Sequence, residues 1–175
     1  MELIILGRGP THYLCPYDKE VWACNGCYSF AKRLDKLFFF DSIDLFDINE
    51  LSEVKAELVT TEVNAIKCKH QLKTTIYPLE EIVEKFQSVF FTSTICYMLA
   101  YALHLGYNKI DLYGIDHVGA NSYTFEKPGV DYWVGRIQQS GGTVTTPLGS
   151  AVCRTIDGKL YGYNYHYPKD FIRIR

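Results

Sequence analysis

Residues 92–116, TSTICYMLAYALHLGYNKIDLYGID, contain the clearest pattern in this sequence: a helix followed by a strand. The hydroxyl residues at 92–94 predict a helix start, because their side chains can accept hydrogen bonds from first-turn amides. The apolar residues that follow recur at helical spacing as far as Leu103, and Gly106 is typical of a helix end. Residues 108–113 then form an apolar run that predicts a strand. A helix between two strands favours a right-handed parallel crossover, so we expect an α/β domain with a mostly parallel sheet.

The segments on both sides of this block continue the alternation of strand-like and helix-like patterns. Short apolar runs predict strands at residues 2–6, 20–24, 36–40, 74–77 and 143–146. Helical spacing predicts helices at residues 49–58, from residue 78 onward, and at residues 130–139. The polar segment 117–130 predicts a loop that could cover a pocket, and residues 156–175 predict a tyrosine-rich C-terminal strand. The length favours a single domain over residues 1–175.

Composition excludes several classes of protein. Hydrophobic residues make up 47% of the chain and charged residues 22%, which excludes intrinsic disorder. The formal net charge of −2 argues against a broad nucleic-acid surface, which needs a dense basic face. No apolar run is long enough to span a bilayer, and residues 1–7 lack the basic region of a signal peptide. We therefore expect a cytoplasmic protein whose six cysteines are reduced thiols.

The carboxyl ends of the predicted strands are the first candidates for a ligand site, since open α/β sheets bind ligands at that edge. The positions concerned are residues 7–10, 24–26, 40–42, 116–123 and the helix start at 92–94. Exposed amides and the dipole at a helix start favour an anion, and Arg8 would add charge-assisted hydrogen bonds to a phosphate. Each feature also has a structural explanation, as a turn at residues 7–10 or a helix cap at residues 92–94.

Four segments of the chain carry a family resemblance: LGRGPT at 6–11, ACNG at 23–26, FTSTICYM at 91–98 and LGYNKIDLYGID at 105–116. The sequence resembles bacterial sialyltransferases, which use a cytidine-monophosphate sugar, and the related hydroxymethylpterin pyrophosphokinase-like proteins, including phage proteins. The resemblance covers roughly residues 1–155. It implies a compact version of a Rossmann-like nucleotide-binding domain, with a nucleotide or nucleotide sugar as ligand and no required cofactor.

This resemblance implies that the turn after the first strand contacts the nucleotide donor. Gly7 and Gly9 match the family turn, in which Arg8 replaces an asparagine that contacts the donor. Asn25 matches a second asparagine that contacts the nucleotide, and Asp41 stands where the family has a third.

The later segments add candidates for binding the donor and its phosphate. Thr92 and Ser93 match the threonine–serine pair that holds the donor, and Tyr123 matches a tyrosine that binds the leaving phosphate. Arg136 occupies the position of the family's catalytic histidine. An arginine cannot act as a general base because its pKa exceeds about 12, so Arg136 is expected to stabilise the leaving phosphate instead.

His117 is the candidate general base in place of the missing histidine. It follows the predicted strand 108–113 at the sheet edge, and a base near pKa 7 within ~3 Å of an acceptor hydroxyl could take its proton. Asp116 is expected to orient His117, although a solvated loop histidine is the structural alternative. On this interpretation, which we favour, the protein is a glycosyltransferase-like enzyme that transfers a sugar from a nucleotide-activated donor.

Two other functions stay open. One is a phosphoryl or pyrophosphoryl transferase that uses Mg²⁺, for which Asp41, Asp44 and Asp116 could be ligands. The other is a protein that binds or sequesters a nucleotide without catalysis. The alternating tyrosines at 161–167 most simply pack on the sheet or form the interface of a homo-oligomer.

Overall fold

The computed structural model describes residues 1–154 and 173–174, and they form one α/β domain around an eight-stranded sheet. Seven strands run parallel, and β8 pairs antiparallel with β7. The strands are β1 (Glu2–Leu6), β2 (Glu20–Cys24), β3 (Lys36–Phe39), β4 (Glu57–Thr60), β5 (Thr74–Ile76), β6 (Lys109–Tyr113), β7 (Thr143–Thr145) and β8 (Arg173–Ile174).

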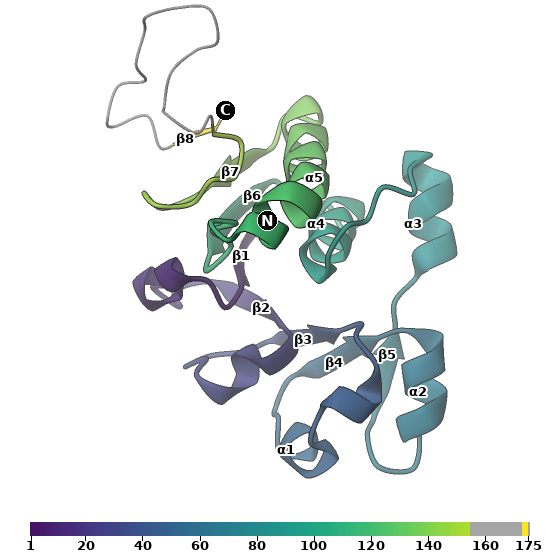
Figure 1. The fold of residues 1–175 in the computed structure, drawn as a ribbon. Helices are drawn as coiled ribbons and strands as arrows, with labels where there is room; N and C mark the ends of the chain where they lie inside the picture. The colour runs from purple at the N-terminus through teal and green to yellow at the C-terminus, as the bar shows by residue number, and fades with distance from the viewer. Residues whose placement is uncertain (155–172, 175) are drawn as a thin grey trace, which may run out of the picture.

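The strand order is β5-β4-β3-β2-β1-β6-β7-β8. The chain starts in the middle of the sheet, moves outward from β1 to β5, and returns to the other side of β1 with β6 (Figure 1). Strand order therefore reverses between β1 and β6. In open α/β sheets the crevice outside the carboxyl ends of such a strand pair is the usual ligand site.

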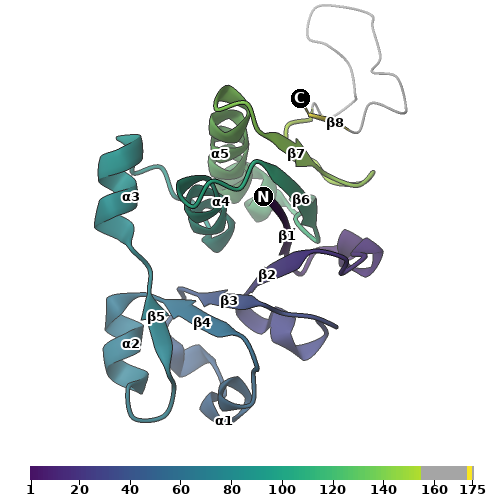
Figure 2. The same ribbon diagram turned by 180° about the vertical axis from the view of Figure 1, so that it is seen from behind.

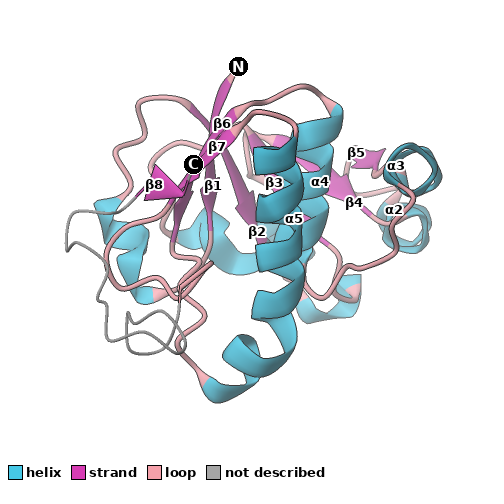
Figure 3. Ribbon diagram, turned by 90° about the horizontal axis from the view of Figure 1, so that it is seen from above, coloured by secondary structure: helices cyan, strands magenta, loops and turns pink. Residues whose placement is uncertain are grey.

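Five α-helices flank the sheet in the described part of the chain. They are α1 (Ile48–Ser52), α2 (Glu62–Cys68), α3 (Leu79–Phe86), α4 (Thr94–His104) and α5 (Lys127–Gln139). α4 and α5 lie side by side and cover one face of the central strands (Figure 3). α1 and α2 lie at the β4–β5 end of the sheet, far from α5 (Figure 2).

The core lies between the central strands and α4–α5. Residues 3–6 of β1 are fully buried, as are Trp22 of β2 and Phe38 of β3. α4 contributes a buried stripe of Ile95, Cys96, Met98, Leu99, Ala100 and Ala102. This continuous apolar packing of parallel strands and covering helix fixes the strand ends, and hence the loops that leave them.

The structure confirms the predicted α/β class, the mostly parallel sheet, and the helix and strand of residues 92–116. The prediction of one helix over residues 49–58 is wrong, because α1 ends at Ser52 and β4 begins at Glu57. Leu58 and Val59 are buried in the sheet, where β4 pairs with β3. Tertiary pairing thus overrides a helical spacing that local sequence alone favours.

The polar segment after β6 is also mostly helical rather than a loop. Residues 122–126 form a π-helical turn that continues directly into α5, and the amide of Lys127 donates to the carbonyl of Ser122. Pro128 has no amide hydrogen for the carbonyl four residues earlier, so the regular α-helical pattern cannot extend back through it. The expected loop is therefore a short helix packed at the start of α5.

The predicted tyrosine-rich strand and its interface fall almost entirely outside the described residues, which include only β8 of that segment. None of the helices in residues 1–154 is both long and apolar enough to cross a membrane.

Candidate functional site

The crevice between β1 and β6 is closed by direct backbone contact. The amide of Gly7 donates to the carbonyl of Tyr113 at 2.8 Å, and the amide of Gly9 donates to the carbonyl of Gly114 at 2.7 Å. A Cβ atom on Gly9 would lie 2.6 Å from a carboxylate oxygen of Asp116. The two glycines of the predicted donor turn therefore allow the loops after β1 and β6 to touch.

Asp116 ties these two loops together from a buried position. One carboxylate oxygen accepts from the amide of Thr11 at 2.7 Å, and the other accepts from the Thr11 hydroxyl at 2.5 Å. The Thr11 hydroxyl in turn accepts from the amide of Gly114 at 2.9 Å. The carboxylate that was expected to orient His117 is thus used to hold the loop after β1.

An open cavity of about 900 Å³ lies beside this closed crevice, at the carboxyl ends of β3, β4 and β5 and the start of α4. Three predicted site residues, Asp41, Thr92 and Ser93, line it. The other lining residues are Phe40, Thr61, Glu62, Ile76, Tyr77, Pro78, Leu79, Glu80, Glu81, Phe91, Thr94 and Tyr97. The cavity is therefore part aromatic and part acidic.

Aromatic rings form one wall of this cavity. The rings of Phe91 and Tyr97 stack at 4.4 Å, and the ring of Phe40 meets Tyr97 edge-on at 4.7 Å. The Tyr77 hydroxyl donates to the carbonyl of Tyr97 at 3.0 Å, and burial raises the pKa of Tyr77. These rings give the cavity an apolar side against which a nucleobase or a sugar can pack.

The start of α4 is the part of the cavity best suited to an anion. Ser93 is the residue that precedes the first turn, but its hydroxyl accepts no hydrogen bond from a backbone amide of that turn, contrary to the expected hydroxyl cap. The Thr92 hydroxyl instead donates to the carbonyl of Glu126 at 2.7 Å. The first-turn amides are therefore left without a side-chain cap, and the helix dipole favours negative charge there.

Asn25 and Arg8 lie at the neighbouring strand ends. Asn25 has a left-handed backbone (φ 49°), and its amide donates to the carboxylate of Asp41 at 2.9 Å. The exposed Arg8 guanidinium lies over Gly26, where an added Cβ would be 3.3 Å from it. Asn25 is thus connected to the cavity through Asp41, and Arg8 has no ion-pair partner among the described residues at the same edge of the sheet.

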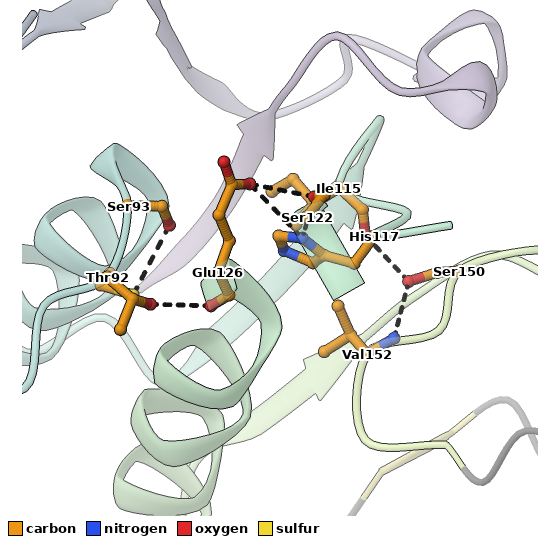
Figure 4. A network of polar contacts seen from close by, with 9 residues as sticks. Thr92, Ser93, Ile115, His117, Ser122, Glu126, Ser150 and Val152 are labelled. Atoms are coloured by element: carbon orange, nitrogen blue, oxygen red, sulfur yellow. Dashed lines mark hydrogen bonds and ion pairs between the residues drawn. The ribbon is translucent and has the colours of Figure 1, made fainter. Parts of the chain in front are cut away.

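His117 does not line the cavity and belongs to a network of polar contacts with Ser122 and Glu126 (Figure 4). Its Nδ1 atom is 2.7 Å from the Ser122 hydroxyl, which donates to the Glu126 carboxylate at 2.9 Å. The backbone carbonyl of Glu126 is the group that accepts from Thr92, so Glu126 connects His117 to the cavity. Burial lowers the pKa of His117, and the Glu126 carboxylate opposes this shift.

Two predicted phosphate ligands lie apart from the cavity lining. Tyr123 is in the π-helical turn, with the Lys127 ammonium 5.3 Å from its ring centre. Arg136 lies nine residues after Lys127 along α5, so about 13 Å farther along the helix axis. Its guanidinium donates to the Tyr132 hydroxyl at 2.7 Å and to the Phe86 carbonyl at 3.1 Å. These contacts give Arg136 a structural role between α5 and the end of α3.

The carboxylates proposed as Mg²⁺ ligands are not gathered. Asp44 binds Ser42 and Lys67, and Asp116 binds Thr11. Within residues 1–154 and 173–174, no group of three or more His, Cys, Asp or Glu side chains has a metal-binding arrangement.

Several solved structures of sialyltransferases resemble this chain in their arrangement of strands and helices. The sialyltransferase CstII from Campylobacter jejuni, in complex with the substrate analogue CMP-3FNeuAc, superposes with a TM-score of 0.58 at 20% identity, over 83% of this chain and 79% of that one. This chain shares the fold of Campylobacter sialyltransferases. CstII with trisaccharide acceptor and CMP matches with a TM-score of 0.57 at 18% identity, covering 99% of this chain and 90% of that chain.

A third sialyltransferase structure extends the likeness. Monofunctional α-2,3-sialyltransferase Cst-I from Campylobacter jejuni gives a TM-score of 0.55 at 17% identity, over 83% of this chain and 74% of that chain. No protein-family model matches this sequence, and no curated protein matches it. The structural likeness confirms the resemblance seen in the sequence at the level of the fold.

Sequence reasoning missed the partners of His117 and the aromatic wall. Ser122 and Glu126 are four residues apart in the segment that was expected to be a loop, so their shared face was not considered. Tyr77 lies at the end of a predicted strand and Tyr97 within a predicted helix, and only the fold brings their rings together. The sequence signal for these partners of His117 was the spacing of Ser122 and Glu126, which lie four residues apart and so share one face of a helix.

Proposed function

We propose that this protein binds a nucleotide-activated sugar in the cavity at the start of α4 and transfers the sugar to an acceptor hydroxyl. The observation that carries the proposal is the uncapped start of α4, open to a cavity of about 900 Å³. It occurs in a fold shared with sialyltransferases that were solved with CMP. No resident cofactor takes part in the reaction.

Binding of the nucleotide uses a group from one strand end and several groups at the start of α4. The first-turn amides of α4 and the Ser93 hydroxyl receive the phosphate beside Thr92, as helix starts do for anions. The exposed Arg8 adds a positive charge from the end of β1. The aromatic wall of Phe91 and Tyr97 packs against the flat part of the ligand.

The transfer step needs a proton acceptor, and His117 fills this role. Because burial lowers its pKa, the ring is neutral at pH 7 and can accept the proton of the acceptor hydroxyl. The hydroxyl oxygen then bonds to the sugar's anomeric carbon, and the phosphate leaves with the electron pair of the broken bond. The negative charge that develops on this phosphate is stabilised by the start of α4.

The charge of the cavity bears on which sugar is transferred. Asp41, Glu62, Glu80 and Glu81 line it, and no Lys or Arg stands among the described lining residues. Like charges repel at close range, so a neutral or amine-bearing sugar suits this cavity better than an anionic one.

A specific observation favours a second function, nucleotide binding without catalysis. His117 is 7% exposed, its Nε2 atom is buried, and it does not line the cavity. For His117 to act as the base, the groups that cover its Nε2 atom have to move before an acceptor hydroxyl reaches it. Turnover decides between the two functions, because both predict binding.

Thermal unfolding with a panel of ligands tests the binding step. The panel contains CMP, other nucleoside mono- and diphosphates, CMP- and UDP-sugars with neutral, amino and acidic sugars, and a pterin, each with and without Mg²⁺. A ligand at a hundred times its Kd adds about 2.7 kcal/mol to the free energy of unfolding. That corresponds to a Tm rise of roughly 5–10 °C for a chain of this size.

Two arginine variants show whether a nucleotide-induced rise in Tm comes from the proposed site. Arg8→Ala is expected to weaken the nucleotide-induced rise, while Arg33→Ala is the matched control, because Arg33 pairs with Asp35 before the amino end of β3.

Release of nucleoside monophosphate from the sugar donor that stabilises the protein, with oligosaccharides as acceptors, then tests transfer. His117→Asn should abolish release and keep the Tm rise. No rise with any nucleotide contradicts the proposal, and a rise without release leaves the non-catalytic function.

A further inference from the structure

The hydrogen-bond network around His117 determines which ring nitrogen carries its proton. Ser122 has a single hydroxyl hydrogen, and an ionised carboxylate only accepts. Because the Ser122 hydroxyl lies 2.9 Å from the Glu126 carboxylate, it donates its hydrogen to Glu126. The Ser122 oxygen, 2.7 Å from Nδ1 of His117, can then only accept. Nδ1 must therefore carry the proton, and in the neutral ring Nε2 holds an unshared electron pair.

We infer that Ser122 and Glu126 are positioning residues that hold His117 in its Nδ1-protonated form, so that Nε2 is the proton acceptor in the transfer reaction. This inference rests on the proposed function for its catalytic meaning, but the protonation state itself does not. His117, Ser122 and Glu126 lie close together, and Ser122 and Glu126 sit four residues apart in the π-helical turn (Figure 4).

The surroundings of the ring support this assignment. His117 has a left-handed backbone (φ 50°), and its side chain is buried with Nε2 lacking a hydrogen-bond partner within the described residues. A protonated Nε2 would be a buried hydrogen-bond donor without a partner. An unprotonated Nε2 can accept a hydrogen bond from the hydroxyl of the molecule that receives the sugar. The ring is thus prepared for a group that donates a hydrogen bond.

The other charged groups near His117 already have partners. Asp116 accepts twice from Thr11, and Asp131 pairs with Lys127 and accepts from the amide of Cys153 at 2.8 Å. Glu126 is the carboxylate closest to the ring, 3.7 Å from Nδ1. Glu126 is therefore the residue that controls the ring, through Ser122.

Glu126 also joins this network to the cavity. Its carboxylate accepts from Ser122, while its backbone carbonyl accepts from the hydroxyl of the cavity-lining Thr92 at 2.7 Å. A ligand that engages Thr92 therefore acts on the same residue that orients His117. This arrangement connects occupation of the cavity with the placement of the base.

Nitrogen NMR of the histidine ring tests the inference directly. Protein labelled with ¹⁵N-histidine gives separate signals for protonated and bare ring nitrogens, and His117→Asn identifies the His117 pair among the five histidines. The wild type at pH 7.5 is expected to show a protonated Nδ1 and a bare Nε2. A protonated Nε2 in the wild type overturns the inference.

Variants of the turn show whether Ser122 and Glu126 cause this state. Ser122→Ala is expected to shift the ring toward Nε2 protonation, and Ser122→Thr, which keeps the hydroxyl, to restore the wild-type signals. Glu126→Gln should lower the pH at which the ring titrates, because the opposing carboxylate charge is lost. The control is Thr124→Ala, which removes an exposed hydroxyl from the same turn and should change nothing. Unchanged ring signals in Ser122→Ala overturn the inference.

Kinetics separate this inference from the proposed function. If the wild type transfers sugar, Ser122→Ala should lower kcat by about tenfold or more at unchanged KM, since a positioned general base contributes ~10²–10⁴. An unchanged kcat overturns the positioning role. If the wild type transfers no sugar, the proposed function fails, and the ring nitrogens still decide the assignment of Ser122 and Glu126.

Discussion

At the carboxyl edge of the sheet, the crevice between β1 and β6 is packed with the protein's own groups, whereas the ends of β3, β4 and β5 border a cavity of about 900 Å³. Thr11 and Asp116 fill the first region, and backbone contacts at Gly7 and Gly9 close it. In the second region, the start of α4 has no side-chain cap, and aromatic rings line the cavity. The reversal of strand order therefore marks the correct edge, but side-chain filling decides which part of that edge can take a ligand.

The largest expected effect comes from filling the closed region further. Gly9→Ala places a Cβ 2.6 Å from the Asp116 carboxylate and 2.8 Å from the Gly114 carbonyl. Overpacking of this kind should lower the free energy of unfolding by about 2–4 kcal/mol, which is a Tm decrease of roughly 5–15 °C. Gly135→Ala is the control, since no heavy atom lies within 4 Å of its added Cβ and alanine favours a helix by up to ~1 kcal/mol. A Gly9→Ala protein as stable as the wild type would show that the crevice is open after all.

A somewhat smaller effect is expected from the buried pair that fills this crevice. Thr11→Val removes a donor to Asp116 and an acceptor for the amide of Gly114, and should cost about 2–3 kcal/mol in unfolding free energy. Combined with Asp116→Asn, the loss should differ from the sum of the two single losses by at least ~1 kcal/mol, because the residues are in contact. Urea unfolding of the four proteins measures this coupling. Strict additivity would contradict the role given to the pair.

The open region is expected to respond in the opposite way, with ligand binding changed more than stability. Ser93→Ala should lower the free energy of unfolding by less than ~0.5 kcal/mol, because its hydroxyl accepts no hydrogen bond from a helix amide, whereas a capping serine usually contributes about 1 kcal/mol. CMP affinity should fall by about ten- to a hundredfold, from loss of one hydrogen bond to a charged group. Calorimetry of the CMP complex and thermal unfolding check both values. A large stability loss with unchanged CMP affinity would show that Ser93 caps α4 and does not bind the ligand.

The smallest effect concerns the pH dependence of stability. Burial lowers the pKa of His117 below the ordinary 6.5, so below pH 6.5 the unfolded chain binds a proton that the folded chain excludes. The folded state therefore loses stability as pH falls from 6.5, by at most about 1.4 kcal/mol per pH unit. His117→Asn, which tolerates the left-handed backbone, should reduce this slope. Equal slopes in both proteins between pH 7 and 5 would show that His117 takes up a proton in the folded state as easily as in the unfolded chain.

Sequence patterns predicted much of the fold because apolar residues at regular spacing indicate a helix or a strand without knowledge of long-range contacts. The helix and strand of residues 92–116 have both apolar periodicity and end signals, and both were predicted correctly. β4 was missed because its buried run is only four residues long and adjoins the charged helix α1. The π-helical turn was missed because polar residues and Pro128 are equally typical of a loop.

The candidate site was predictable as an edge of the sheet but less so as a set of contacts. Asp41, Thr92 and Ser93 line one cavity as the strand-end rule suggests. In the described residues Asp116 forms no hydrogen bond with the His117 ring, and both of its oxygens accept from Thr11, 105 residues away in sequence. Arg136 is held by Tyr132 and Phe86, and such long-range contacts leave no local signature in a single sequence.

A titration of ¹⁵N-labelled protein with CMP, followed through backbone amide signals, tests the central claim that the open cavity at the start of α4 binds the nucleotide. The claim predicts that the largest shifts fall on residues 92–96 and Asp41, and that Gly9 and Gly114 change little. The largest shifts at Gly7, Gly9 and Gly114 would place the ligand in the crevice between β1 and β6 and contradict the claim. An absence of shifts anywhere in the protein would contradict nucleotide binding itself.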